Sequence, residues 1–377
     1  MKKRNSVAMI VILLVNCLCI GSAMGIPVIV AYKDAPSALN ATLSAAHNAE
    51  LLDPDIFAVA MDIPGDEVDN LHTDINIRYI ENDEIFTAAS DLQTRDKDKF
   101  RTADLLQVPW NIRQIHADEV HLRNINGLGV RVAILDTGID YTHPDLKGAY
   151  AGGYNYVANT ADPLDDNNHG THCAGILAAT GRKQLVGTSP NVSVYAIKVL
   201  DAKRSGNLSS IIKGIYWAKK NRMKVVSMSL GSYKDSVVLH EAVDDATENG
   251  ILFVAASGNR YNPRFIDYPA NYSSVLSVAA VDRNNQHLSF SNGGKVDISA
   301  PGKDILSTIP GGAYLETYGT SQATPHVAGV AAMLFELHPD WTPERVKCRI
   351  KNTATYLGPA DLYGAGLVNA ANATLMG

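Results

Sequence analysis

The 377-residue sequence predicts an α/β protein with a mostly parallel central sheet flanked by helices, preceded by a small α+β domain. Short, β-branched apolar runs predict the buried strands of the sheet, and they cover residues 130–135, 192–199, 224–228, 251–255 and 275–281. Amphipathic stretches such as residues 208–221 and 237–249 lie between these runs and predict helices. Apolar strands that alternate with helices are typical of a parallel sheet covered on both faces, where sites form at the carboxyl ends of the strands.

The first 25 residues have the pattern of a secretory signal peptide. Three basic residues at positions 2–4 precede the apolar run of residues 7–20, and Ala23 and Gly25 follow as a cleavage site of the A-x-G type. A retained membrane anchor is the alternative, because the apolar run approaches the minimum length of a membrane span. We expect the signal to be removed and the protein to be secreted.

Residues 26–89 are predicted to form a separate acidic domain. They contain twelve acidic and two basic residues, whereas the whole chain has a formal net charge of −6. Three strand-like runs alternate with helical stretches and predict a small α+β fold: residues 27–32, 56–61 and 75–80. Residues 90–106 then form an exposed polar linker suited to proteolytic processing, and the second domain covers residues 107–377. The chain has no basic stripe, so nucleic acid is not an expected partner.

Three polar motifs follow predicted strands or open predicted helices in the second domain. They are residues 136–138 (DTG), 167–175 (NNHGTHCAG) and 319–329 (GTSQATPHVAG). Each motif alone is weak, since a serine at a helix start is by default an N-cap. Together they supply what a serine nucleophile needs, which is an imidazole to take its proton and a carboxylate to hold that imidazole. Asp136, His169 and Ser321 are the candidates for these roles.

These motifs resemble those of the subtilisin-like serine proteases, and the resemblance runs from about residue 107 to the C-terminus. Gln322 departs from the methionine common beside the nucleophile, which bears on oxidation and not on the mechanism. The resemblance implies a subtilisin-like fold and a monomeric serine endopeptidase that cleaves polypeptides through an acyl-enzyme, without a cofactor for the chemistry. It also implies a self-processing precursor, in which residues 26–89 are a ferredoxin-like propeptide that acts as intramolecular chaperone and inhibitor.

The same resemblance assigns the groups around the substrate. Asn259 would donate its side-chain amide to the oxyanion together with the backbone N–H of Ser321, and an ordinary turn residue is the alternative. Two loops would pair with an extended substrate, through Ser229, Leu230 and Gly231 on one side and Ser205 and Gly206 on the other. Pairing of this kind contacts the backbone of the substrate and not its side chains, so it predicts broad specificity.

Asp267 aligns with the glycine that many subtilisins carry at the floor of the pocket for the residue before the scissile bond. A carboxylate there would favour Arg or Lys in the substrate through a charged hydrogen bond. The linker offers matching cleavage targets at Arg95, Lys97, Lys99 and Arg101. In the alternative, Asp267 pairs with Arg264 or points to solvent, and the pocket is broad and apolar.

Structural calcium is also implied by the resemblance, at Asp145. The loop of residues 180–184 should complete that site but carries two cations, which oppose Ca²⁺, so both outcomes stay open. A weaker cation site would use Asp297 with the backbone carbonyls of Ala270, Tyr272 and Val275. Three further acids form either another calcium site or a solvated loop, and they are Asp162, Asp165 and Asp166.

Cys173 and Cys348 are the two cysteines outside the signal, and both are expected to be free thiols. Cys173 lies near His169, where one branch of the family carries a free cysteine; a small buried apolar role is the alternative. His172 and Cys173 beside His169 do not have the spacing of a zinc site.

Two other functional classes compete with the serine protease. An aspartic protease would need a second Asp-Thr-Gly triplet, and the sequence has none. A catalytically inactive binding module would keep the fold but lose a catalytic group, whereas Asp136, His169, Ser321 and Asn259 are all present.

Overall fold

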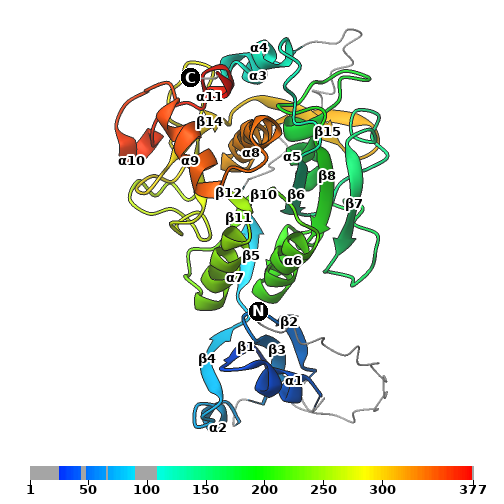
Figure 1. Cartoon of the computed structure of the whole chain (residues 1–377), viewed down its shortest axis with the longest axis vertical. Helices are drawn as coiled ribbons and strands as arrows, with labels where there is room; N and C mark the ends of the chain where they lie inside the picture. Colours follow the sequence, from blue (N-terminus) through cyan, green and yellow to red (C-terminus); the bar gives the residue numbers. More distant parts are fainter. Residues whose placement is uncertain (1–24, 44–47, 65–66, 90–107, 376–377) are drawn as a thin grey trace, which may run out of the picture.

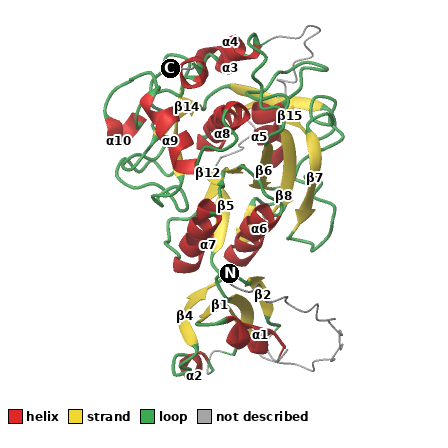
Figure 2. Cartoon of the chain, in the orientation of Figure 1, coloured by secondary structure: helices red, strands yellow, loops and turns green. Residues whose placement is uncertain are grey.

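The computed structural model of the chain describes residues 25–43, 48–64, 67–89 and 108–375 (Figure 1). The predicted signal peptide, except Gly25, and the predicted linker lie outside the described residues. A small sheet with two helices lies below a larger layered body of helices and strands (Figure 2). None of the helices described in these ranges has the length and apolar character needed to cross a membrane.

The N-terminal sheet confirms the small α+β fold predicted for this part of the chain. Its strand order is β2–β3–β1–β4, and each neighbouring pair is antiparallel. The elements are β1 (Ile26–Tyr32), α1 (Ala35–Leu43), β2 (Glu50–Asp53), β3 (Ala58–Ile63), α2 (Val68–Leu71) and β4 (Ile77–Asn82). Val28 and Val30 of β1 point into the small core beneath the sheet, whereas Ile29 belongs to the core of the larger body. This alternation places the second face of the sheet against the larger body.

Seven strands form the central sheet, and every neighbouring pair is parallel. In their spatial order the strands are β14 (Ile298–Pro301), β13 (Leu276–Val281), β12 (Leu252–Ala256), β10 (Val225–Met228), β6 (Arg131–Asp136), β8 (Ser193–Lys198) and β7 (Tyr150–Asn155). The five predicted strands are the five inner strands. The sequence pattern missed β7 and β14, which lie at the two edges. The first contains two glycines and the second has four residues and ends in proline, as edge strands tolerate.

Helices cover both faces of this sheet, as predicted. Val132 and Ile134 of β6 belong to one core, and Ala133 and Leu135 belong to the other. The first core packs α3 (Trp110–Gln114), α4 (Ala117–His121), α5 (His169–Ala178), α8 (Thr320–Leu337), α9 (Pro343–Asn352) and α11 (Ala370–Thr374). The second packs α6 (Leu208–Lys220) and α7 (Val237–Glu248). The larger body also contains the hairpin of β15 (Ile305–Ile309) and β16 (Ala313–Thr317), and the short helix α10 (Ala360–Tyr363).

A third, three-stranded sheet joins the two parts of the chain. Its central strand, β5 (Ile85–Ala88), follows the small domain and lies between β9 (Ser205–Asn207) and β11 (Leu230–Gly231) of the larger body. The pairing is antiparallel on both sides. The end of the acidic domain therefore occupies the edge at which the sequence predicted that a substrate would pair.

Candidate active site

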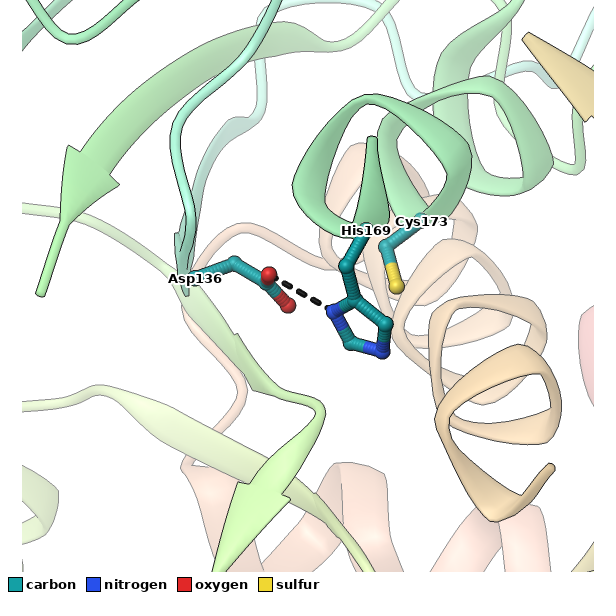
Figure 3. Close-up of side chains that lie close together, drawn as sticks. All are labelled: Asp136, His169 and Cys173. Carbon is teal, nitrogen blue, oxygen red and sulfur yellow. Dashed lines mark hydrogen bonds and ion pairs between the residues drawn. The ribbon is translucent and has the colours of Figure 1, made fainter. Parts of the chain in front are cut away.

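The first pair of candidate residues meets where β6 ends and α5 begins. The Nδ1 atom of His169 lies 2.7 Å from Oδ1 of Asp136, and both side chains are fully buried (Figure 3). Gly170 permits this approach, because a Cβ there would lie 2.1 Å from the carbonyl oxygen of Gly138. The backbone N–H of Thr137 donates to the same Oδ1 at 2.7 Å. The carboxylate thus fixes which imidazole nitrogen faces it, and the other nitrogen, Nε2, has no partner within the described residues.

Ser321 is the second residue of α8 and approaches this pair from another part of the chain. Its Oγ donates to the carbonyl oxygen of Ser229 at 3.1 Å, and Oγ of Ser229 donates to the Ser321 carbonyl at 2.9 Å. The hydroxyl thus hydrogen-bonds to this carbonyl and not to the imidazole, so it must reorient before its proton passes to His169. Ser321 lies at the start of a helix, where backbone N–H groups are free to meet negative charge.

Ala89 places a peptide carbonyl against two donors beside Ser321. Its oxygen accepts hydrogen bonds from Nδ2 of Asn259 at 2.5 Å and from the backbone N–H of Ser321 at 3.3 Å. The Asn259 amide is oriented from behind, since Thr320 donates to its Oδ1 from the backbone N–H at 3.0 Å and from Oγ1 at 2.8 Å. Two donors that converge on one carbonyl oxygen can stabilise an oxyanion at that place.

The predicted pairing residues hold the segment that leads to Ala89. Leu230 pairs with Ala88 and Gly231 with Thr87, while Gly206 pairs with Phe86 and Ser205 with Thr87. The backbone N–H of Ala89 also donates to the Ser229 carbonyl at 2.9 Å. Strand addition on two edges fixes an extended chain mainly through its backbone.

Comparison with known proteins agrees with this arrangement. The family model described as the subtilase family matches residues 127–366. The chain belongs to the subtilase family. An alkaline protease from Alkalihalobacillus alcalophilus is 44% identical over 319 residues, which cover 84% of this chain and 79% of that protein. Subtilisin Savinase from Lederbergia lenta is 47% identical over 269 residues, covering 71% of this chain and 98% of that protein. A thermostable alkaline protease from Halalkalibacterium halodurans is 48% identical over 269 residues, covering 71% of this chain and 73% of that protein. This subtilase is therefore a hydrolase of the serine endopeptidase type that acts on polypeptides.

Asp267 of the subtilase packs against Gly231, which pairs with β5, and against Gly258. A Cβ on Gly258 would come within 2.5 Å of its Oδ2, and one on Gly231 within 2.9 Å of its Cβ. Its carboxylate accepts hydrogen bonds from Nε of Arg260. The partner is thus Arg260 and not Arg264, the residue that the sequence offered as the alternative. No sequence pattern distinguishes the two arginines, because both lie on the same irregular loop.

Four hydrogen-bond donors surround the carboxylate of Asp145, the predicted calcium ligand. Oδ1 accepts from the backbone N–H of Lys183 at 2.6 Å, and Oδ2 accepts from those of Gln184 and Leu185 at 3.0 and 3.1 Å. The hydroxyl of Tyr314 donates to Oδ2 at 2.7 Å. Burial opposes ionisation of Asp145, but these donors together outweigh it and hold its pKa below the ordinary value. Three backbone N–H groups and a tyrosine hydroxyl stand where oxygen ligands would be needed, so the residues around Asp145 do not fit Ca²⁺.

The acidic cluster after β7 is occupied by internal contacts of the protein. Asp165 is buried and accepts hydrogen bonds from the hydroxyls of Thr137 and Thr171 at 2.8 and 2.6 Å. Asp166 pairs with Lys198 at 2.7 Å, and Asp162 accepts from the hydroxyl of Tyr141 at 3.0 Å. These carboxylates brace the loop that leads to His169.

Cys173 and Cys348 are free thiols in the structure, as the sequence predicts. Cys173 lies on α5 beside the imidazole, and the ligand atoms of Asp136, His169 and Cys173 lie within 4.8 Å of one another (Figure 3). Burial raises the pKa of the Cys173 thiol well above its ordinary value, so this group is a poor thiolate ligand for a metal ion. Burial also lowers the pKa of His172 to about 3, which keeps its ring neutral against the Leu315 carbonyl.

Two carboxylates of the acidic domain were missed as functional residues. Glu81 accepts hydrogen bonds from Oγ of Ser236 at 2.7 Å and from the backbone N–H of Val237 at 2.8 Å, at the start of α7. Asp83 accepts from the backbone N–H and Oγ of Ser209 at 2.8 and 2.7 Å, at the start of α6. Negative charge is stabilised at helix N-termini, so part of the acidity of residues 26–89 serves to bind this surface.

Proposed function

We propose that this subtilase is a secreted, monomeric serine endopeptidase that is made as a self-processing precursor and acts through Asp136, His169 and Ser321. One observation carries the proposal. The carbonyl of Ala89 receives hydrogen bonds from Asn259 and from the backbone N–H of Ser321, beside the Ser321 hydroxyl. The bond after Ala89, at the predicted boundary between the acidic domain and the linker, is therefore the first substrate of the enzyme.

In the proposed mechanism, Oγ of Ser321 rotates toward Nε2 of His169 and gives up its proton as it attacks the Ala89 carbonyl carbon. The oxygen becomes an oxyanion held by Asn259 and the Ser321 N–H. His169 returns the proton to the leaving nitrogen of Ser90, which leaves Ala89 as an acyl-enzyme. A water molecule, deprotonated by the same imidazole, then releases the Ala89 carboxylate and restores Ser321. Asp136 stabilises the cationic imidazole, and every proton in this scheme is carried by the chain or by water.

Residues 26–89 are proposed to remain bound after this cleavage as chaperone and inhibitor. The pairing of β5 on two edges supports this role, as do the carboxylates of Glu81 and Asp83 at the starts of α7 and α6. Arg78 adds two hydrogen bonds to Glu241 on α7, each at 2.9 Å. The small domain thus orders both helices that flank the proposed substrate.

The proposal is tested with purified precursor that lacks the signal. Wild type should yield a new N-terminus at Ser90 and should be labelled by a fluorophosphonate, whereas Ser321→Ala should remain full-length and unlabelled. Thr324→Ala removes a hydroxyl one turn further along α8 and should still mature. Maturation of Ser321→Ala by itself would rule out Ser321 as nucleophile. An unlabelled wild type that never matures would favour an inactive binding module.

A further inference from the structure

Lys347 carries a buried ammonium group that the proposed chemistry does not use. The residue lies on α9, and its side chain is 7% exposed. Its Nζ donates to the backbone carbonyls of Ser273 at 2.7 Å and Val275 at 2.8 Å. The same atom lies 3.5 Å from Oδ2 of Asp297, whose side chain is 8% exposed. Lys347 is therefore surrounded by oxygen atoms in the way that a small cation would be.

A second lysine pairs with the same carboxylate, and a third binds backbone carbonyls nearby. Nζ of Lys351 lies 2.6 Å from Oδ1 of Asp297, on the side that is open to solvent. Nζ of Lys295 donates to the carbonyls of Asn271 and Tyr272, each at 2.8 Å. Two ammonium groups pair with one carboxylate and a third binds carbonyls nearby, so the local charge is positive and opposes the entry of a further cation.

These groups stand where the family resemblance implied a weak metal site. That site would use the carboxylate of Asp297 and three carbonyls, and lysines already bind the carbonyls of Tyr272 and Val275. Ser277 also hydrogen-bonds to the Asp297 carboxylate, because its backbone N–H and Oγ donate to Oδ2 at 3.1 and 3.0 Å. The residues present therefore do not fit a bound metal ion.

We propose that the Lys347 ammonium is the resident cation of this site. A covalently attached cation cannot be lost by dilution or removed by a chelator, so the stability of the fold at Asp297 does not depend on metal ions in solution. Loss of the ammonium would remove the Lys347 donor from the carbonyls of Ser273 and Val275 and one of the two ion-pair partners of the buried Asp297 carboxylate. Those oxygen atoms would then form a site for a small free cation, of which K⁺ is close to ammonium in size.

Lys347→Met tests this proposal because methionine is one atom shorter than lysine. The change keeps most of the stem and leaves a gap at the position of Nζ. The background is the Ser321→Ala precursor, in which self-digestion cannot disturb the measurement. The thermal midpoint Tm is measured by circular dichroism at constant ionic strength in the chlorides of K⁺, Na⁺, Ca²⁺ and tetramethylammonium, the last being too large to enter.

In the Ser321→Ala parent, no cation should bind at Asp297. Any difference in Tm between the four salts should therefore be the same when Asp297→Asn is added. Lys347→Met should lower Tm by roughly 5–15 °C in tetramethylammonium chloride, as expected for removal of one partner of a buried pair. At least one small cation should restore most of this loss with a saturable dependence on its concentration. Adding Asp297→Asn to Lys347→Met should abolish the recovery.

Lys351→Met is the matched control, because its ammonium binds the other oxygen of Asp297 and its side chain is 36% exposed. We expect a smaller loss of Tm that is the same in all four salts. The proposal is overturned if Lys347→Met has one Tm in every salt or folds in none of them. It is equally overturned if a small cation stabilises the parent through Asp297. Solubility of Lys347→Met in only one of the small-cation salts would support it.

Discussion

The Nε atom of Arg260 donates to both carboxylate oxygens of Asp267, at 3.1 and 3.2 Å. The acid is 5% exposed, whereas the arginine side chain is 47% exposed and lies over the ring of Tyr233. Burial raises the pKa of Asp267, and the charge of Arg260 opposes that rise. A cationic substrate side chain that reached Asp267 would therefore have to compete with Arg260 for this carboxylate.

Arg260→Leu is expected to reveal the selectivity that Asp267 can confer. The wild type should favour Arg over Phe before the scissile bond only weakly, because Asp267 is already paired. The variant should raise the Arg-to-Phe ratio of kcat/KM by about tenfold, since a charged hydrogen bond is worth roughly 1.5–3 kcal/mol. The ratio should rise further with pH as more Asp267 becomes ionised.

Asp267→Gly, alone and combined with Arg260→Leu, provides the controls for that experiment. Both variants should show the same low ratio, because neither has a carboxylate at this position. If Arg260→Leu leaves the ratio at the wild-type value, Asp267 does not line the pocket.

Asn259→Leu should lower kcat by roughly 10²–10³-fold with little change in KM, which is the usual effect of removing one oxyanion donor. Leucine has a similar shape but cannot donate to the carbonyl oxygen that Ala89 now places there. Thr320→Val removes only the hydroxyl that orients the amide and should cost less. Steady-state kinetics on a peptide substrate measure both. A rise in KM at constant kcat would assign Asn259 to substrate binding.

Cys173 should make the enzyme sensitive to a bulky mercurial. Its Sγ lies against the Ser321 carbonyl at 3.6 Å and beside His169, so a large adduct would displace the imidazole. Cys173→Val should remove the inhibition and keep activity, and Cys348→Ser should change neither because Cys348 is exposed and distant in sequence. Activity is measured after incubation with the reagent. Equal inhibition of Cys173→Val would locate the reactive thiol elsewhere.

Asp145 should contribute stability that depends on pH with a defined sign. Its pKa is lowered in the fold, so its contribution is fully present above the pKa of the unfolded chain and is lost as pH falls through the folded value. In the Ser321→Ala background, Asp145→Asn should lower the free energy of unfolding by roughly 1–3 kcal/mol at neutral pH. Urea unfolding from about pH 7 to about pH 2.5 should show that the difference in free energy of unfolding between Asp145→Asn and its parent shrinks in acid. A difference in free energy of unfolding that grows in acid would contradict a lowered pKa of Asp145 in the fold.

The central fold is predictable because inner parallel strands are buried on both faces and read as continuous apolar runs. The edges are not, since β7 and β14 carry glycines or few residues and lack such runs. Asp136, His169 and Ser321 stand out because each belongs to a local motif of small and polar residues.

Charged partners are much harder to predict than motifs. Lys347 donates to carbonyls 72 and 74 residues away, and no local sequence pattern predicts a contact over that distance. Arg260 and Arg264 are equivalent in sequence terms, and only the path of their loop decides which one reaches Asp267. The hydrogen bond from the Ser321 hydroxyl to the Ser229 carbonyl joins residues 92 positions apart, and a local motif does not show it either.

The pairing of β5 with a strand on each of its two edges has a consequence for the timing of activation. Cleavage after Ala89 would break one covalent bond and none of the backbone pairs to β9 and β11. The newly made enzyme would therefore begin as a product complex, and its activity would appear only when another molecule digests the bound domain. A population should show a lag followed by acceleration, and the lag should shorten as protein concentration rises. Onset of this kind is autocatalytic and of second order, so crowding at the site of release, more than time since synthesis, would set when proteolysis begins.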